Sequence, residues 1–311
     1  MSGDRVRLRY TKLGRVRFLG HRDLARSLER ALRRADVPVA RTGGFSPRAK
    51  VSFGLALPTG AESTAEYLDL DLVEGADVDP AGLPDRLSAV LPPGVDVIAA
   101  APVAPGDDSL QHAVTSSEWE VAMEADPLEL SAGVDRALAA STLPFTYERK
   151  GVQAEADLRP ALLSLAVLLP LVLGDAVRLH LELASAAAAG GRTVRPSEVV
   201  SALWPHLGAG RVRRVAQWID RDGVRREPLT LPPNAAVALH ASWRAPQSRS
   251  TNDGTDRLIR ASRGQPSAAG RPHPAVRPER PDRPDEPGPE HRSRADEPAP
   301  GRGWAVAPAG A

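Results

Sequence analysis

The chain contains no cysteine among its 311 residues. Disulfides, thiolate metal sites, iron–sulfur ligation and cysteine nucleophiles are therefore excluded. Long apolar runs are missing too, because the longest one, residues 162–173, is shorter than the roughly 20 residues that a membrane-spanning helix needs. The start of the chain, Met1-Ser2-Gly3-Asp4-Arg5, carries no apolar signal region. We therefore expect a cytoplasmic protein.

Nucleotide and metal motifs are also missing. The sequence has neither the Walker pattern nor the GxGxxG pattern, so nucleotide hydrolysis and a dinucleotide site receive little support. Its seven histidines are scattered without metal-ligand spacing. The carboxylates Asp69, Asp71 and Glu74 alternate along an expected strand, which favours a polar outer face over a cation site. We assign no metal and no cofactor to the chain.

The net charge of +1 conceals a segregation of charge along the chain. Residues 1–50 hold fourteen Lys and Arg against four Asp and Glu, whereas residues 51–230 hold fourteen against twenty-six. Local fields rather than totals recruit charged ligands, so the basic segment predicts an anionic partner. Most of these basic residues are arginine, which binds phosphate or carboxylate through two parallel hydrogen bonds. A GC-rich genome would also favour arginine codons, and composition does not separate the two causes.

Apolar periodicity predicts the elements of the first half. Apolar residues from Val6 to Tyr10 alternate with arginines and predict a β-hairpin over residues 5–18. Leucines at i, i+4 and i+8 from Leu24 predict an amphipathic helix over residues 22–35. The resulting order is that of a split βαβ, or ferredoxin-like, fold. The other elements expected here are strands at 37–40, 50–57, 67–72 and 95–100 and a helix at 80–91.

The second half partly repeats this plan, so the predicted fold class is α+β with two ferredoxin-like halves. We expect domains at residues 1–103 and 104–230. Residues 231–311 hold fourteen of the thirty prolines and no apolar periodicity, which predicts a disordered tail. The elements expected in the second half are strands at 119–123, 145–149, 154–158, 162–169 and 177–183 and helices at 127–140 and 196–207.

The helix expected at residues 22–35 carries four arginines on the side opposite its leucines. Phosphate groups would use such a surface, because binding them releases counterions. Two alternatives remain open: an ordinary solvated helix face, and pairing of these arginines with the acidic residues 51–135 of the same chain. The four residues are Arg22, Arg26, Arg30 and Arg33.

A glycine pair in the same segment is a second candidate anion site. Gly43 and Gly44 can adopt positive φ and expose backbone N–H groups, and Arg41, Arg48 and Lys50 flank them. This pattern predicts a loop that holds a phosphate. An ordinary hairpin turn explains two adjacent glycines equally well.

His21 is the one candidate for catalysis. It lies between a predicted strand and a predicted helix, where an imidazole can act as a general base or as an RNA-cleaving acid or base, with Asp23 close by. Asp23 itself is typical of a helix N-terminus, where negative charge is stabilising. No second histidine or tyrosine stands near His21 in the sequence. We therefore favour a structural or anion-contacting role and assign no catalytic residue.

Three stretches carry a resemblance to a known family: RFLGHRDL at 17–24, GGFSPRAKVSF at 43–53 and LPTGAES at 57–63. They resemble the radical SAM-linked proteins, a domain of unknown function encoded beside or fused to cobalamin-type radical-SAM proteins. The resemblance covers about residues 4–205 and weakens after the first 75. Residues 150–151 and 157–160 resemble the family's second recurring patch. Ala49 departs from the proline expected between two basic residues, which affects the rigidity of the loop and not its charge.

The resemblance implies an association with radical-SAM chemistry, and several enzymes of that class modify RNA. Because this chain has no cysteine, the iron–sulfur cluster must belong to a separate radical-SAM protein. We expect a non-catalytic accessory that binds tRNA or rRNA and presents it to that enzyme. The alternatives are an RNA-processing or RNA-modifying enzyme, and a protein-interaction module without RNA. The expected RNA-binding residues are Arg17, His21, Arg22, Arg26, Arg30, Arg33, Arg41, Gly43, Gly44, Arg48 and Lys50, with a second patch at Arg149, Lys150 and Arg159.

Overall fold

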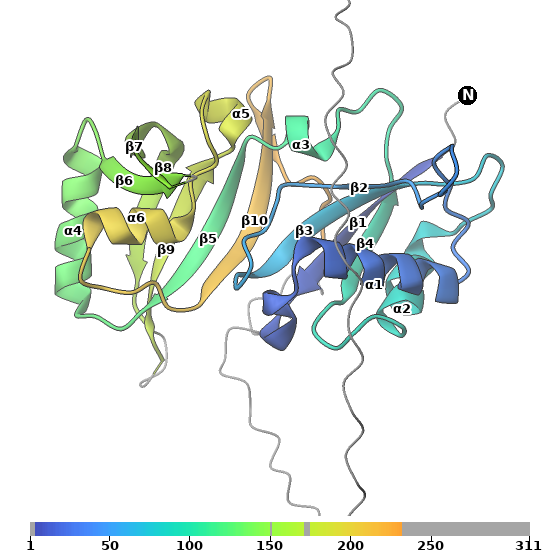
Figure 1. Ribbon diagram of the computed structural model, residues 1–311, viewed down its shortest axis with the longest axis horizontal. Coiled ribbons are helices and arrows are strands. Elements are labelled where there is room, and N and C mark those ends of the chain that lie inside the picture. The colour runs from blue at the N-terminus through green and yellow to red at the C-terminus, as the bar shows by residue number, and fades with distance from the viewer. Residues whose placement is uncertain (1–3, 150, 171–174, 232–311) are drawn as a thin grey trace, which may run out of the picture. The chain divides into compact units, whose positions relative to one another are not determined.

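The computed structural model describes residues 4–149, 151–170 and 175–231. Their strands form a nine-stranded sheet and a separate hairpin (Figure 1). The hairpin consists of β6 (Pro144–Arg149) and β7 (Val152–Asp157). The strands of the sheet are β1 (Arg5–Lys12), β2 (Val51–Phe53), β3 (Glu62–Asp71), β4 (Val97–Pro102), β5 (Ser116–Met123), β8 (Leu162–Leu168), β9 (Val177–Ala184), β10 (Val212–Arg221) and β11 (Val224–Arg226).

The sheet has the order β4-β1-β3-β10-β5-β9-β8, with β2 paired to β3 and β11 paired to β10. Its pairs are antiparallel except that of β3 with β10. β3 is long enough to pair with β2 near its end and with β10 at its start, where Glu62 lies opposite Arg213. The strands of the two halves of the chain therefore meet between β3 and β10.

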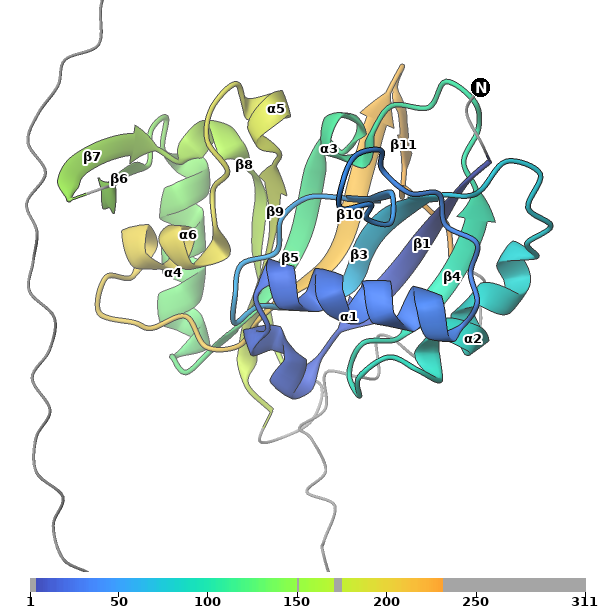
Figure 2. The same cartoon turned by 45° about the vertical axis from the view of Figure 1, so that its right-hand side comes forward.

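Four longer helices pack on one face of this sheet (Figure 2). α1 (His21–Arg34) and α2 (Leu83–Ser88) bury leucines against β1, β3 and β4, and α4 (Pro127–Ala139) and α6 (Pro196–Leu203) pack on β5, β8 and β9. Two apolar cores thus lie side by side on the same face. The shorter helices are α3 (Leu110–Ala113), α5 (Ala186–Ala189) and the 3-10 turns η1 (Gly14–Phe18), η2 (Pro80–Gly82) and η3 (Arg159–Ala161).

The helix expected at residues 22–35 is confirmed as α1. Leu24, Leu28, Ala31 and Leu32 are buried on one stripe, as the 3.6-residue period requires. Full burial of each leucine contributes about 1.5–3 kcal/mol. Because the stripe faces the sheet, the arginines of α1 face solvent.

Of the hairpin expected over residues 5–18, the first strand is confirmed and the second is wrong. Its first strand is β1, but residues 14–18 form η1 instead of a returning strand. Both edges of β1 are occupied by β3 and β4, so a third partner strand has no place to pair. The turn is held by Lys12, whose ammonium donates to the carbonyl oxygens of Arg17 and Leu19 at 3.2 and 2.9 Å.

The α+β class is confirmed. The narrower expectation of two ferredoxin-like halves is not confirmed, because both halves contribute strands to one continuous sheet. The boundary expected between residues 103 and 104 stays a prediction. The tail expected at residues 231–311 lies, apart from Leu231, outside the described residues. Within the described ranges, no helix is long and apolar enough to cross a membrane.

Candidate functional site

Four exposed arginines line the outer side of α1; we call Arg22, Arg26, Arg30 and Arg33 the arginine face. Arg26 forms an exposed ion pair with Asp23 at 3.3 Å, and Arg30 donates to the hydroxyl of Ser27 at 3.0 Å. Within the part of the chain that the structure describes, Arg22 and Arg33 have no carboxylate partner. An exposed i,i+3 pair contributes little to stability, so these charges remain available to a ligand.

The arginines of β1 are arranged differently. Arg5 pairs with Asp71 at 2.9 Å and Arg7 with Asp69 at 2.7 Å, across the β1–β3 ladder and on the sheet face away from the helices. Arg9 pairs with Glu227 at 2.7 Å. Part of the basic excess of residues 1–50 is therefore neutralised inside the chain. The arginines that stay exposed are concentrated on α1 and on the loop that follows it.

That loop is a hairpin closed at its base. Thr42 donates its backbone N–H to the carbonyl of Arg48 at 2.8 Å, and the backbone N–H of Arg48 donates to the Thr42 hydroxyl at 3.0 Å. Gly44 has φ +102°, a conformation that favours glycine. The residue after it, Phe45, is fully exposed at the tip of the hairpin. Three exposed cations flank this tip: Arg41, Arg48 and Lys50.

A second exposed aromatic stands just before α1. Phe18 is 62% exposed, and the guanidinium of Arg17 lies 4.6 Å from the centre of its ring. Arg17 also approaches Glu62 at 3.5 Å. The cation and the flat ring are thus held together at the N-terminal end of the arginine face.

Of the second expected patch, only the side chain of Arg159 lies within the described residues, and it has a structural role. Arg159 donates to the carbonyl oxygens of Ala140 and Leu162 at 3.1 and 2.8 Å, which ties η3 to the end of α4. The side chain of Arg149 and all of Lys150 lie outside the described residues.

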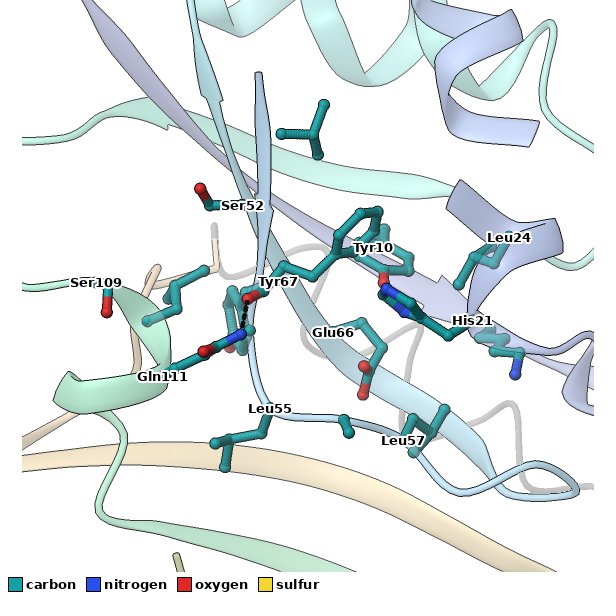
Figure 3. Close-up of a pocket in the computed structure, with 16 residues that line it drawn as sticks. Tyr10, His21, Leu24, Ser52, Leu55, Leu57, Glu66, Tyr67, Ser109 and Gln111 are labelled. Carbon is teal, nitrogen blue, oxygen red and sulfur yellow. Dashed lines mark hydrogen bonds between the residues drawn. The ribbon is translucent and has the colours of Figure 1, made fainter. Parts of the chain in front are cut away.

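His21, the first residue of α1, lines a pocket of about 640 Å³ that we call the His21 pocket. Figure 3 shows the imidazole beside Tyr10 and above Glu66, with all three side chains reaching into the same space. The imidazole also packs edge-on against Phe53, with 4.7 Å between the ring centres. From α1, the residues His21 and Leu24 line the pocket, and Arg22 of the arginine face follows His21 directly in the chain.

Burial has opposite effects on two groups of this pocket. It raises the pKa of the Tyr10 phenol well above its ordinary value, and the nearby Glu66 carboxylate adds to the effect. It lowers the pKa of the Lys12 ammonium, which Glu66 partly opposes. Low dielectric disfavours the charged form of both side chains, so each is shifted toward its neutral form.

Glu66 is held by a buried arginine from the other half of the chain. Arg214 donates to one oxygen of Glu66 at 2.9 Å and to the carbonyl oxygens of Leu55 and Ala56 at 3.1 and 2.7 Å. Its guanidinium also stacks on Trp119, 4.6 Å from the ring centre. Residues 54–60, the crossing loop, are thereby fixed over the junction of β3 and β10 and separate the His21 pocket from a neighbouring pocket of about 980 Å³.

Sequence reasoning found only one member of this pocket, His21. The polar residues that accompany it come from β1 and β3 and carry no shared motif, because the sheet and not the chain brings them together. The one sequence feature that could have pointed to this pocket is the presence of Glu66 and Lys12 within strand sequences that are otherwise apolar or alternating. Among the described residues, no group of three His, Asp or Glu side chains is placed to bind a metal ion. The members missed are Tyr10, Lys12, Glu66 and, behind it, Arg214.

Comparison with protein families places residues 5–196 in a family described as an uncharacterized protein conserved in bacteria, DUF2344. Because the match covers more than half of the chain and includes α1, the hairpin at 41–50 and the His21 pocket, this chain belongs to that family. A search of curated proteins found no match to the sequence of this chain.

Proposed function

We propose that this chain is an RNA-binding accessory protein that acts in the cytoplasm, does no chemistry itself and presents tRNA or rRNA to a separate radical-SAM enzyme. The observation that carries the RNA-binding part is the contrast between the paired arginines of β1 and the exposed arginines of α1.

A helix surface that serves solubility alone usually mixes charges of both signs. α1 instead carries five arginines against two carboxylates, Asp23 and Glu29. A phosphate backbone running along it would be neutralised by the guanidinium groups and would release its counterions. Arginine adds paired hydrogen bonds to phosphate oxygens. This arrangement supports an anionic polymer as the ligand.

Two exposed aromatics support RNA with unpaired bases. Phe45 projects between exposed cations of the hairpin, and Phe18 lies under the guanidinium of Arg17. Proteins that recognise single-stranded segments of RNA stack unpaired bases on such rings. Loops and ends of tRNA or rRNA present bases of this kind.

The link to a radical-SAM enzyme rests on the resemblance of residues 17–24, 43–53 and 57–63 to radical SAM-linked proteins. The lack of cysteine in this chain requires the cluster to be on another polypeptide. In our interpretation the two halves are ferredoxin-like repeats, since β4-β1-β3-β2 and β10-β5-β9-β8 place their first to fourth strands in the same order. Co-elution of the chain with a reconstituted cobalamin-type radical-SAM protein from the same organism tests this link, and separate elution would overturn it.

The RNA-binding proposal is tested by charge reversal on the full chain. The variant carries Arg22→Glu, Arg26→Glu and Arg33→Glu, and the control carries the same charge change at exposed arginines elsewhere, Arg136→Glu, Arg195→Glu and Arg226→Glu. Affinity for labelled tRNA is measured over a series of salt concentrations. The first variant should bind at least about tenfold more weakly, which is about 1.4 kcal/mol. Its salt slope should fall by about two, at roughly 0.7–0.9 per lost phosphate contact.

The control variant should retain most of the affinity, and thermal melts should show that both variants fold, because the leucine stripe of α1 is unchanged. Wild-type protein that shows no salt-dependent binding to RNA would overturn the proposal. Equal losses in the two variants would show that only net charge matters. The arginine face would then be assigned to a contact with an acidic protein.

A further inference from the structure

The His21 pocket combines flat apolar walls with buried polar groups. Its apolar lining comes from α1, β2, the crossing loop and α3, at residues Leu24, Phe53, Leu55, Leu57 and Leu110. A volume of about 640 Å³ lies within the range of about 300–1,000 Å³ that is typical of small-ligand sites. The pocket therefore has room for a planar ring and for part of the backbone attached to it.

Four side chains that line the pocket retain hydrogen-bonding capacity although each is more than nine-tenths buried. One is Tyr67, whose buried hydroxyl has no partner among the described residues. The Tyr10 hydroxyl has no hydrogen-bond partner among the described residues. One carboxylate oxygen of Glu66 accepts a hydrogen bond from Arg214, and the other oxygen has no partner among the described residues. Lys12 uses two of its three N–H donors on backbone carbonyls. The side chains of Tyr10 and Glu66 reach into the pocket, so a ligand that bonds their free oxygens would be bound favourably.

We propose that the His21 pocket takes up one unpaired nucleobase of the RNA that lies along the arginine face. This inference rests on the proposed function. A nucleobase has apolar faces that fit against the leucines and the packed Phe53 and His21 rings, and an edge that carries both donors and acceptors. The polar groups of the pocket match such an edge, with Glu66 as acceptor, Lys12 as donor and Tyr10 as either.

The position of His21 connects the pocket to the RNA surface. It begins α1, it is exposed, and its ring forms part of the pocket wall against Phe53. An RNA strand that contacts Arg22 and Arg26 therefore passes close to His21, a residue of the pocket wall.

The carboxylate of Glu66 defines which bases fit. A carboxylate oxygen without a partner requires a donor, and the amino groups of adenine and cytosine supply one. Uracil carries no amino group, and its one edge donor, the ring N3–H, lies between two carbonyl oxygens that a carboxylate repels. The pocket therefore selects an amino-bearing base over uracil.

The test compares labelled oligo(A), oligo(C) and oligo(U) RNA of equal length at one salt concentration, with full-length protein. The variants are Tyr10→Phe, which keeps the ring and removes the hydroxyl, and Glu66→Gln. Glu124→Gln on the surface is the matched control. Wild type and control should bind oligo(A) or oligo(C) about fivefold more tightly than oligo(U), the effect expected of one hydrogen bond. Glu66→Gln should lose this preference, and Tyr10→Phe should weaken binding of oligo(A) and oligo(C) by a similar factor. Both variants should keep the wild-type salt slope.

Tyr10→Phe guards against a folding defect in Glu66→Gln, because the Tyr10 hydroxyl makes no hydrogen bond within the described residues and the ring is kept. Equal affinity of the wild type for the three RNAs, or unaltered binding of oligo(A) and oligo(C) by a folded Tyr10→Phe protein, would overturn the pocket inference and leave RNA binding intact. Absence of all salt-dependent binding would instead overturn the proposed function. Free AMP and CMP form a second arm. If they bind in a manner sensitive to Tyr10→Phe while RNA binding is unaffected, the pocket is a site for a free nucleotide and the inference is wrong.

Discussion

Arg214 and Glu66 form a hydrogen-bonded ion pair, 2.9 Å between Nη1 and Oε1, in which both side chains are more than nine-tenths buried. The two residues lie on β10 and β3, the strands at which the halves of the sheet meet. The same guanidinium holds two carbonyl groups of the crossing loop. One side chain thus joins the two halves of the chain and shapes the floor of the His21 pocket.

Removal of this arginine should strongly destabilise the fold. Arg214→Met would leave the Glu66 carboxylate buried without its cation and the carbonyl groups of Leu55 and Ala56 without their donor. Breaking a buried pair in this way costs about 3–5 kcal/mol. Urea denaturation measures the loss in free energy of unfolding. Arg30→Met, at an exposed position on α1, is the control. It should change the free energy of unfolding by less than about 0.5 kcal/mol. A loss in Arg214→Met no larger than that of the control would contradict the role given to the pair.

A second stability prediction concerns the packing of α4 against the end of α6. A Cβ atom added at Gly133 would lie 2.4 Å from the ring of the buried Trp204. Gly133→Ala should therefore force the indole to move and cost about 1–3 kcal/mol in spite of the better helix propensity of alanine. Gly208→Ala is the matched control, since nothing lies within 4 Å of its added Cβ. A Gly133→Ala protein as stable as the control would show that Trp204 has room to shift.

The sequence predicted the elements whose apolar residues are regularly spaced. α1, α4 and the strands β8 and β9 stand close to their expected ranges, because each buries a single stripe or face. β10, a central strand, was not predicted at all. Arg213, Arg214 and Gln217 are buried within it, so its sequence resembles an exposed segment. Their partners lie on β3, about 150 residues earlier, and no local pattern in the sequence reveals that pairing.

The arginine face could be predicted from the sequence for the same reason that α1 could: a helical period separates its two sides. The ion pairs of the β1 arginines could not be predicted from the sequence. Arg5 and Arg7 are the same residue type as the α1 arginines, and only the β1–β3 register places Asp71 and Asp69 beside them. Charge counts along the chain therefore overestimate the anion-binding surface wherever a strand pairs with an acidic neighbour.

Two tyrosines should resist ionisation while the protein is folded. Burial raises the pKa of both Tyr10 and Tyr67 above the ordinary value of 10. The folded state then keeps protons that the unfolded state releases above that pH, so stability falls as the pH rises beyond 10. Phenolate absorbance followed together with circular dichroism should show these two groups ionising only as the fold is lost. The Tyr10→Phe, Tyr67→Phe variant should lack that part of the signal. Ionisation of both phenols ahead of the dichroism change would contradict the prediction.

The exposed Phe45 should contribute to RNA affinity and not to stability. Its ring makes no core contact, because it is fully exposed at the hairpin tip, so Phe45→Ala should leave the urea midpoint unchanged. If an unpaired base stacks on it, the substitution should weaken binding of single-stranded RNA by about 1–3 kcal/mol. Binding of double-stranded RNA, whose bases are already stacked, should change much less.

The control for this effect is Val73→Ala, which removes an exposed apolar side chain from a loop outside the hairpin. Phe45→Trp adds a second check, because a larger ring in an open position should keep or improve stacking while the charge stays the same. The salt slope should be equal in all these proteins, since none of the changes removes a cation. Equal weakening of single-stranded and double-stranded RNA by Phe45→Ala would mean that the ring supports the shape of the hairpin and does not stack on a base.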